Sequence, residues 1–452
     1  MATAVLALAA GCASVPDIDT AIGPSEAARP EIVGAHGPLS AKQRQAVLDR
    51  LKKQDNGGDL LAQHLAIEQT VAETPLVVGN RTRILHDGDS TFREMFRVMH
   101  AARDHINLEY YIVQDVESGG ERLGDLLIAK RRAGVAVNLM YDSYGSMATP
   151  GEFFDRLRAN GISVVEFNPI NPLRARGGYS LNDRDHRKIL VVDGKTAIVG
   201  GVNLFKGYQN GSGSLTGSDG GPSEFWHDTD LEIQGPAVAE VQRLFLDHWR
   251  EQEGPPLDTT RFFPAVPAAG GEILRVLGSN HRDLVPRYYA TLISAIRDAQ
   301  TSIRVTAAYF VPTHDELEAL ERAARRGVDV RLLLPSMSDA PPALDAGRSH
   351  YSDLLEAGVK IYEIQNEMLH SKTVTIDGVW SIIGSSNFDH RSVLFNDEID
   401  AVVLGRETAD QLETQFREDI QTSKAIDPRV WADRPFFEKF KEMLSRIWQT
   451  LL

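Results

Sequence analysis

Residues 185–203 read DHRKILVVDGKTAIVGGVN, and residues 369–387 read LHSKTVTIDGVWSIIGSSN. The two stretches share one spacing, His-x-Lys-x4-Asp-x6-Gly-[Gly/Ser]-x-Asn, although most residues between these positions differ. A single histidine near a lysine on a strand is usually a surface pair. Two copies with matching spacing across eighteen positions indicate that these residue types are needed together.

We call these two stretches the strings. In each string the spacing places the histidine and lysine side chains on one side of an extended chain. Residues two apart on a β-strand point to the same face, so His186 projects together with Lys188. Asp193 precedes a glycine, as is typical of a tight turn after a strand. The glycines before Asn203 let the backbone approach a ligand, and asparagine supplies an amide donor. The second string repeats this set as His370, Lys372, Asp377 and Asn387.

The sequence around the two strings is also duplicated. INLEYYIV at residues 106–113 corresponds to IRVTAAYFV at 303–311, and AKRRAGVAVNLMYD at 129–142 corresponds to AARRGVDVRLLLPS at 323–336. Each copy predicts a strand, an amphipathic helix and a second strand with a near-continuous apolar run. This pattern is typical of a mostly buried sheet covered by helices. We therefore predict an α/β fold with two duplicated lobes.

The predicted domains follow from these repeats. The first lobe should span residues 76–255 and the second 256–425, with the boundary in the proline-rich segment 253–271. Residues 13–75 are polar and broken by proline and glycine, which predicts a linker with a docking segment. Within it we expect one helix from Ser40 to about Lys53, with Ser40 as N-cap.

The composition restricts the class of protein. The chain has 452 residues, of which 42% are hydrophobic, enough for the core of a large soluble protein. A formal net charge of −15 argues against a broad basic surface for long nucleic acid. No apolar run reaches the ~18 residues needed to span a bilayer. The cations that gather before and within the first string, either in a solvated loop or at a site for an anionic substrate, are Arg174, Arg176, Arg184, Arg187 and Lys188.

The doubled string resembles that of the phospholipase D superfamily, and the resemblance covers about residues 77–423. Within this superfamily the chain is most similar to bacterial cardiolipin synthases, through YYIVQDVESGGERLGDLL (110–127), FWHDTDLEIQGPAV (225–238) and GSSNFDHRSVLFNDEIDAVVL (384–404). Many cardiolipin synthases begin with two membrane-spanning helices that this sequence lacks, so the resemblance is closer to the shorter forms. It implies two mostly buried mixed sheets flanked by helices, related by a pseudo-twofold axis, with the active site between them.

The resemblance also implies a mechanism through a phosphohistidine. One histidine attacks phosphorus, and the other protonates the leaving alcohol and then deprotonates the incoming alcohol or water. Imidazoles suit both roles because their pKa lies near 6.5. By family habit His186 is the nucleophile and His370 the acid and base. No metal or cofactor is expected, because the phosphate oxygens would be held by Lys188, Lys372, Asn203 and Asn387.

Each histidine should also have a carboxylate that fixes its tautomer. By resemblance, Glu398 serves one histidine and Asp228 the other, and each opens a strand-like run. The alternative for both is a surface carboxylate on a strand. If the assignment is correct, the two imidazoles face each other across one gap, with their reactive nitrogens about 6 Å apart.

The two ends of the chain predict contact with a membrane surface. AVLALAAGC at residues 4–12 resembles the end of a lipoprotein signal peptide, which makes Cys12, the only cysteine, a candidate for lipidation. The alternative is an apolar N-terminus with a chance cysteine. Residues 426–452 form a tail, and its apolar stripe from Arg434 to Leu452 predicts a helix that either docks on its own domain or lies among lipid headgroups. The Gly/Ser-rich segment 207–223 is either a solvated linker or a flap.

These features predict a phosphatidyltransferase similar to cardiolipin synthase, peripheral or lipid-anchored in a bacterial cell envelope. Its lipid partners would be phosphatidylglycerol and, as an alternative donor, phosphatidylethanolamine. The first alternative is a phospholipase D that hydrolyses phospholipids to phosphatidic acid. A nucleic-acid phosphodiesterase agrees less well with the acidic net charge. A binding protein with a dead site agrees less well with two intact strings.

Overall fold

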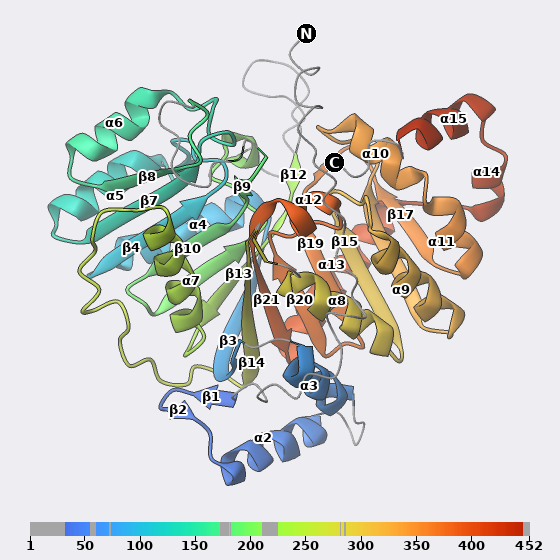
Figure 1. Cartoon of the computed structure of the whole chain (residues 1–452), viewed down its shortest axis with the longest axis horizontal. Coiled ribbons are helices and arrows are strands. Elements are labelled where there is room, and N and C mark those ends of the chain that lie inside the picture. Colours follow the sequence, from blue (N-terminus) through green and yellow to red (C-terminus); the bar gives the residue numbers. More distant parts are fainter. Residues whose placement is uncertain are drawn as a thin grey trace.

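The computed structural model describes residues 32–54, 60–71, 74–171, 180, 182–209, 225–280, 282–283 and 286–445. Within these ranges the chain forms two α/β lobes that share one long mixed sheet, with helices on its faces (Figure 1). Figure 1 places the first lobe, in blue and green, beside the second, in yellow to red. The predicted fold class is confirmed.

The described part of the first lobe contains seven main strands and four helices. The strands are β3 (Leu76–His86), β4 (His105–Tyr110), β7 (Ala136–Asp142), β8 (Ser163–Phe167), β10 (Lys188–Val192), β11 (Thr196–Gly200) and β13 (Thr229–Gln234). The helices are α4 (Asp87–Ala101), α5 (Leu123–Arg132), α6 (Gly151–Ala159) and α7 (Val238–Glu251). Between them lie β5 (Glu117–Ser118), β6 (Glu121–Arg122), β9 (Arg184–Asp185), β12 (Trp226–His227) and the 3-10 helix η3 (Lys206–Gln209).

The second lobe repeats the strand set. Its main strands are β14 (Glu272–Ser279), β15 (Ser302–Ala307), β16 (Asp329–Pro335), β17 (Lys360–Ile364), β19 (Lys372–Ile376), β20 (Trp380–Gly384) and β21 (Asn396–Leu404). Its helices are α8 (Arg287–Asp298), α9 (His314–Arg325), α10 (Pro341–Arg348), α11 (Tyr351–Ala357), α12 (His390–Leu394) and α13 (Arg406–Thr422). The short elements are β18 (Met368–Leu369), β22 (Lys424–Ala425), α14 (Pro428–Ala432) and α15 (Phe436–Ser445).

The strand pairings form a palindrome. The order across the sheet is β8-β7-β4-β10-β11-β13-β3, then β14-β21-β20-β19-β15-β16-β17. Among these main strands, only the outer three of each half pair in parallel. The pseudo-twofold axis passes between β3 and β14, which are antiparallel. Strand β3 therefore joins the lobes: its residues 77–80 pair with β14 and its residues 81–86 with β13.

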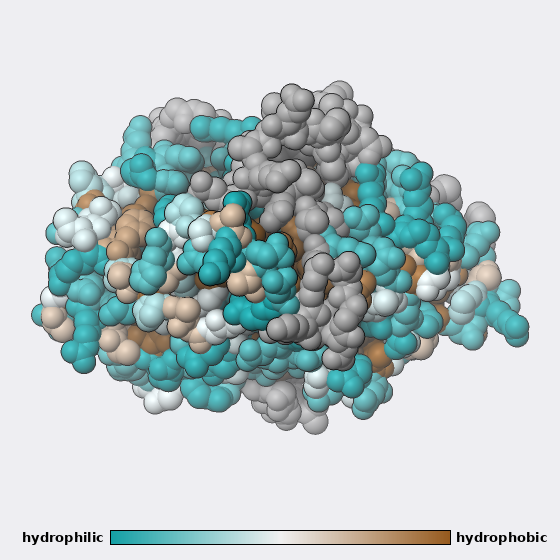
Figure 2. All heavy atoms as spheres, turned by 90° about the horizontal axis from the view of Figure 1, so that it is seen from below, coloured by the Kyte–Doolittle hydropathy of each residue, from teal (hydrophilic) through white to brown (hydrophobic). Residues whose placement is uncertain are grey.

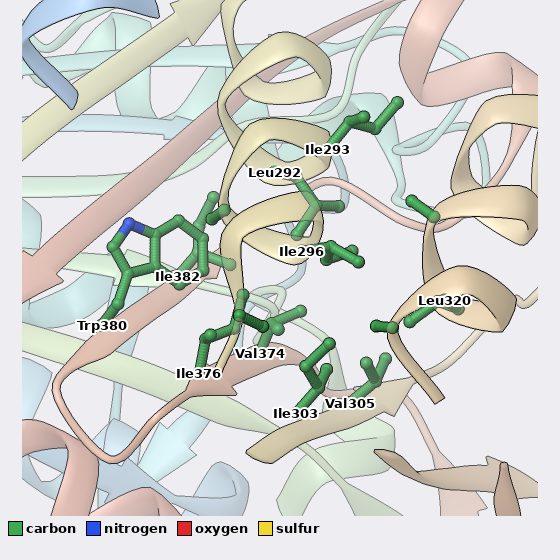
Figure 3. Packing of buried hydrophobic residues seen from close by; sticks show 14 of the residues in the cluster. Leu292, Ile293, Ile296, Ile303, Val305, Leu320, Val374, Ile376, Trp380 and Ile382 are labelled. Atoms are coloured by element: carbon green, nitrogen blue, oxygen red, sulfur yellow. The ribbon is translucent and has the colours of Figure 1, made fainter. Parts of the chain in front are cut away.

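The core explains why the first string contains a continuous apolar run, Ile189–Val192. In β10, Leu190 and Val192 pack in the core of the first lobe, whereas Ile189 and Val191 pack in a core that both lobes share. A strand buried on both faces needs apolar residues at every position. The shared core also contains, from other strands of the two lobes, Leu231, Ile233, Leu274, Ile399 and Ala401. Figure 3 shows the corresponding core of the second lobe, where Leu292 and Ile296 of α8 lie over Val374 and Ile376 of β19.

The segment before the first lobe contains β1 (Ile32–Gly34), β2 (Gly37–Pro38) and two helices, α2 (Ala41–Gln54) and α3 (Leu60–Val71). The helix predicted from Ser40 is α2. The Ser40 hydroxyl accepts the N–H of Gln43 at 3.3 Å, and the Gln43 side chain accepts the N–H of Ser40 at 2.9 Å, so Ser40 is its N-cap. None of the described helices is long and apolar enough to cross a bilayer.

Helix α3 docks on the second lobe through a buried charge. The Glu68 carboxylate is fully buried and lies 2.8 Å from the guanidinium of Arg275, which is also fully buried. The indole N–H of Trp380 donates to the same carboxylate at 2.8 Å. These contacts attach helix α3 to the sheet of the second lobe.

We expect Glu68→Ala to lower the free energy of unfolding by about 3–5 kcal/mol, because it leaves the Arg275 charge buried and unpaired. Urea denaturation measures the effect. The double variant Glu68→Met/Arg275→Met should recover most of the loss, since it removes both charges. As a control, Glu318→Ala removes a half-exposed partner of the exposed Arg322 and should cost less than about 0.5 kcal/mol. Equal losses for Glu68→Ala and Glu318→Ala would contradict this account.

Candidate active site

Two short parallel strand pairs bring the histidines of both lobes together. Strand β9 of the first lobe pairs with the start of β21, and β12 of the first lobe pairs with β18 of the second. Each histidine follows its own strand and donates its backbone N–H across the lobe boundary. His186 donates to the carbonyl of Asp397 at 2.9 Å, and His370 donates to the carbonyl of His227 at 2.8 Å. The two attachments are equivalent under the pseudo-twofold axis.

Both histidines line one cavity of about 300 Å³. Residues of both lobes form its walls, so the cavity lies at the lobe boundary. The strings predicted that the two imidazoles would share one cavity, as they do. The separation of about 6 Å between their reactive nitrogens remains a prediction. The remaining residues of the wall are Tyr111, Ile112, Arg184, Asn203, Phe205, Tyr208, Trp226, Tyr309, Val311, Asp339, Ala340, Ala343, Asn387, Asp389, Arg391 and Asn396.

Each histidine is bound to a carboxylate of the other lobe. Nδ1 of His186 lies 3.0 Å from Oε2 of Glu398, and Nδ1 of His370 lies 2.7 Å from Oδ2 of Asp228. Both carboxylates are fully buried. Because Nδ1 is occupied in each ring, Nε2 is the nitrogen left for chemistry in the cavity. The structure therefore pairs these carboxylates with the histidines as the sequence predicted, and it adds that both pairs cross the lobe boundary.

The two carboxylates are held by different neighbours. Glu398 accepts hydrogen bonds from the hydroxyls of Ser385 and Ser392 and from the amide of Asn396 at 3.1 Å. At the equivalent position to Ser385, Gly201 has no side chain, and an added Cβ would lie 2.1 Å from the Asp228 carboxylate. The first lobe can thus bring its shorter Asp228 close to the backbone only because residue 201 is a glycine.

Tyr208 is a site residue that sequence reasoning missed. Its buried hydroxyl donates to Asp228 at 2.6 Å and lies 2.9 Å from Nδ1 of His370. The repeat contains the signal: Tyr208 follows Asn203 by five residues, as Ser392 follows Asn387, and the Ser392 hydroxyl donates to Glu398 at 3.0 Å. The positions correspond, but the residue types differ.

The asparagines of the strings line the cavity together with the histidines, and each lysine contacts the histidine of its own string. The Lys188 ammonium donates to the carbonyl of His186 at 2.5 Å and lies over the ring of Tyr111, and Lys372 makes the equivalent contacts with His370 and Tyr309. The Asn203 oxygen accepts the N–H of Ile112 at 3.1 Å, which leaves its NH2 group as a donor for the cavity. The Asn387 oxygen is buried without a hydrogen-bond partner.

Burial sets the protonation states before substrate arrives. It lowers the pKa of His186 to about 4, with Glu398 opposing the shift, and it also lowers the pKa of His370. Burial lowers the pKa of Lys188 to about 7 and that of Lys372 to about 8. The imidazoles are therefore neutral at neutral pH. A bound phosphate anion would favour the charged form of every one of these groups.

Burial alone would raise the pKa of Glu398 and of Asp228, but their histidine partners and the lysines hold both values below the usual range. Both carboxylates are consequently ionised at neutral pH. An ionised acceptor fixes the proton of each neutral imidazole on Nδ1 and leaves a lone pair on Nε2. Each lobe thus prepares the histidine of the other for nucleophilic or base chemistry.

A family sequence model described as "Cardiolipin synthase, PLD-like domain" matches residues 95–212 and 292–420, one match for each string. The chain belongs to the cardiolipin synthase family of phospholipase D-like proteins. A cardiolipin synthase of Geobacillus kaustophilus (strain HTA426) is 35% identical over 394 residues, which cover 86% of this chain and 76% of that relative. One of Alkalihalophilus pseudofirmus (strain ATCC BAA-2126 / JCM 17055 / OF4) is 34% identical over 415 residues, covering 91% and 79%.

The family assignment makes this chain a phospholipase D-type phosphatidyltransferase. Its fold is also similar to the crystal structure of phosphatidylserine synthase from Haemophilus influenzae Rd KW20, with a TM-score of 0.65 over 86% of this chain and 100% of that one. The two sequences are only 12% identical, so this likeness concerns the fold alone.

Asp193 and Asp377, which were predicted to be catalytic, do not line the cavity. Each lies about 17 Å along its strand from the lysine of its string, since five residues of extended chain rise about 3.3 Å each. Asp193 accepts the backbone N–H groups of Arg103, Asp104 and His105. Asp377 accepts those of residues 300–302 and contacts His64 of α3 at 3.1 Å. They anchor the turns after β10 and β19.

The described residues include one group that could hold a metal ion, formed by Glu109, Asp185 and His248, whose ligand atoms lie within 4.8 Å of one another. The contacts of these atoms indicate ion pairing instead. Nδ1 of His248 lies 2.7 Å from Glu109, and the Arg187 guanidinium lies 3.3 Å from the same carboxylate. His248 and Arg187 thus both place positive charge beside Glu109.

Several predicted features lie outside the described residues. They are the candidate lipidation site Cys12, the basic residues Arg174 and Arg176, most of the Gly/Ser-rich segment and the last seven residues of the tail. The other basic residues of that group are buried: Arg184 lines the cavity, and Arg187 contacts both lobes.

We expect Glu398→Gln and Asp228→Asn each to lower kcat about 10³- to 10⁴-fold, because an amide no longer fixes the imidazole tautomer. Steady-state phosphatidyl transfer by the purified variants measures the effect, with circular dichroism to verify folding. Asp193→Asn is the matched control. It should lower the melting temperature through the loss of charge-assisted hydrogen bonds, while the folded enzyme keeps its kcat. A loss of kcat for Asp193→Asn as large as for Glu398→Gln would return Asp193 to the catalytic set.

Proposed function

We propose that this enzyme transfers a phosphatidyl group to the free alcohol of phosphatidylglycerol, which produces diphosphatidylglycerol and releases the alcohol of the donor lipid. One observation carries the proposal: a chain of the cardiolipin synthase family places two histidines, each paired with a carboxylate of the other lobe, in one cavity. Phosphatidylglycerol and phosphatidylethanolamine are the donors to be compared.

The first half of the reaction uses the two histidines in different roles. Nε2 of His186 attacks phosphorus, the bond from phosphorus to the headgroup oxygen breaks, and His370 gives that oxygen a proton from its own Nε2. The phosphate charge raises the pKa of His370 enough for it to carry this proton. Lys188 and Lys372, with the asparagine amides, stabilise the charge on the phosphate oxygens. The product is a phosphatidyl group bound to His186.

The second half reverses the proton transfer. His370, now neutral, takes the proton of the incoming hydroxyl, whose oxygen attacks phosphorus as the bond to His186 breaks. Water in place of phosphatidylglycerol would yield phosphatidic acid. Aromatic side chains cover much of the cavity wall and favour the glycerol headgroup over bulk water as the second nucleophile. These side chains are Tyr111, Phe205, Tyr208, Trp226 and Tyr309.

Incubation with headgroup-labelled phosphatidylglycerol, with and without phosphatidylethanolamine, tests the proposal. We expect diphosphatidylglycerol as the main product and a loss of at least about 10⁴-fold in kcat for His186→Ala and His370→Ala. In a quenched reaction the label of a phosphatidyl-labelled donor should be found on His186 and be absent from His186→Ala. Phosphatidic acid as the main product would favour the hydrolase. Label on His370 in place of His186 would exchange the two roles.

We also propose that the end of the molecule that carries the cavity faces a lipid bilayer. Among the described residues, exposed large apolar side chains gather mainly in two groups, Tyr144, Met147 and Ile170 in the first lobe and Val430, Phe437 and Leu444 in the second. Met147 is 67% and Phe437 74% exposed. Neighbouring exposed apolar residues are typical of interaction surfaces.

The two groups border the cavity on its two sides. The Tyr144 ring lies 5.7 Å from the guanidinium carbon of Arg184, which lines the cavity. Helix α15, which carries Phe437 and Leu444, is attached to α10 by an ion pair between Lys441 and Asp345 at 2.7 Å, and α10 lines the cavity too. The opposite end, seen in Figure 2, is mainly hydrophilic in its described part, with apolar side chains in small separate spots.

We expect Tyr144→Ser/Met147→Ser and Phe437→Ser/Leu444→Ser each to weaken binding to phosphatidylglycerol vesicles at least about tenfold, because each buried apolar side chain contributes about 1.5–3 kcal/mol. Vesicle sedimentation measures binding. Phe263→Ser is the matched control, since Phe263 is 45% exposed but packs beside Arg243 of α7 and should not change binding. Unchanged binding for both double variants would contradict the proposed orientation.

Lipidation of Cys12 is proposed as a separate tether. Replacement of Cys12 by serine in cells would release the protein from the membrane fraction if the acyl chain is the main attachment. The surface variants above should then keep wild-type fractionation. Fractionation that follows the surface variants and ignores Cys12→Ser would assign attachment to the apolar groups alone.

A further inference from the structure

A histidine–aspartate ion pair lies at each of the two strand pairs that join the lobes; we call each ion pair, with its neighbouring contacts, a closure. The two closures are reversed in the positions of histidine and aspartate. At the pair β9–β21, Nε2 of His248 on α7 lies 3.2 Å from Oδ2 of Asp397. At the pair β12–β18, Nε2 of His227 lies 3.2 Å from Oδ2 of Asp419 on α13. In one case the helix supplies the histidine, and in the other it supplies the aspartate. Both contacts cross the lobe boundary.

The strand partner in each case is the residue next to a histidine-binding carboxylate. Asp397 directly precedes Glu398, and His227 directly precedes Asp228. The same two residues supply the carbonyls that accept the backbone N–H groups of His186 and His370. Each ion pair therefore holds one residue, Asp397 or His227. That residue binds the backbone of His186 or His370 and precedes the carboxylate that pairs with the same histidine.

Around His248 the closure is a network within the interior. Its Nδ1 lies 2.7 Å from Glu109, and Arg187 donates to the carbonyls of Glu398 at 3.2 Å and Ser279 at 2.9 Å. Burial and the Arg187 charge oppose protonation of His248, but Glu109 and Asp397 outweigh them and raise its pKa to about 10. The imidazolium is thus held between a carboxylate of the first lobe and one of the second.

Around His227 the closure is smaller and nearer the surface. Burial opposes protonation of His227, but Asp419 and, at 3.8 Å, Glu367 raise its pKa. Two residues after His227, the hydroxyl of Thr229 lies 2.9 Å from the hydroxyl of Ser371 in the other lobe. Ser371 has the position that Arg187 has in the first string, so the two closures use different side chains for the same connection.

We propose that the two ion pairs position the two histidines independently: His248–Asp397 holds His186 with Glu398, and His227–Asp419 holds His370 with Asp228. His248 and His227 are positioning residues, since neither lines the cavity. The inference rests on the proposed function for the roles of nucleophile and acid, and it adds a separate support for each role.

Two donor lipids separate the two effects: phosphatidylglycerol, whose alkoxide must be protonated as it leaves, and a phosphatidyl p-nitrophenyl ester, whose leaving group needs no acid. Stopped-flow measurement of the first turnover reports formation of the phosphoenzyme from each. We expect His248→Gln to slow both reactions about 10- to 100-fold, because the nucleophile is displaced. We expect His227→Gln to slow the reaction of phosphatidylglycerol by a similar factor and that of the nitrophenyl ester by less than about threefold.

A charge exchange provides the rescue test. His227→Asp and Asp419→His should each slow the phosphatidylglycerol reaction about 10- to 100-fold, and the double variant His227→Asp/Asp419→His should return to within about fivefold of wild type, because it recreates the polarity of the other closure. The melting temperature of each variant is measured in parallel. A general structural role would slow both donors equally in every variant, whatever the melting temperature, and would overturn the proposal.

Three further outcomes distinguish a failure of this inference from a failure of the proposed function. Wild-type rates for His248→Gln and His227→Gln, with an inactive His186→Ala, would overturn this inference and leave the proposed function intact. An active His186→Ala would instead reject the proposed function. One equivalent of bound metal in the purified enzyme, lost in His248→Gln, would show that Glu109, Asp185 and His248 form a metal site, and would overturn the ion-pair account.

Discussion

The exchange of carboxylates between lobes is the constraint on which the site depends. A histidine of the first lobe is oriented by Glu398 of the second, and a histidine of the second by Asp228 of the first. Neither lobe alone contains a complete pair. The reactive geometry therefore exists only while the lobes are held in register, and the parallel strand pairs β9–β21 and β12–β18 supply that register beside the histidines themselves.

The duplicated fold was predictable because its signals are repeated and local. Spacing within the strings placed histidine and lysine on one face, and the apolar runs indicated strands buried on both sides, as β10 is. The pairings of Glu398 and Asp228 came from resemblance, and their distances in the structure agree with it. Helix α2 was predicted from its capping residue, whereas α3, which docks on the second lobe, was not predicted.

Other features lay beyond sequence reasoning because the two copies solve the same problem with different residues. Tyr208 and Ser392 both donate to a carboxylate, yet one is an aromatic phenol and the other a small alcohol. The same applies to the ion pairs of His248 and His227, whose polarity is reversed. Asp193 was assigned to catalysis because it belongs to the string, whereas its regular spacing reflects the strand length before an anchored turn.

Strand β3 has a mechanical consequence. Its two halves pair with strands of different lobes, so a ladder of backbone hydrogen bonds continues through β3 from one lobe to the other, with one register shift at Glu272–Ile273. Hinged opening between the lobes would have to break that ladder and expose the shared core beneath it. A connection of this kind opposes movement of the lobes as whole bodies, so conformational change costs less in the loops and side chains around the cavity than between the lobes.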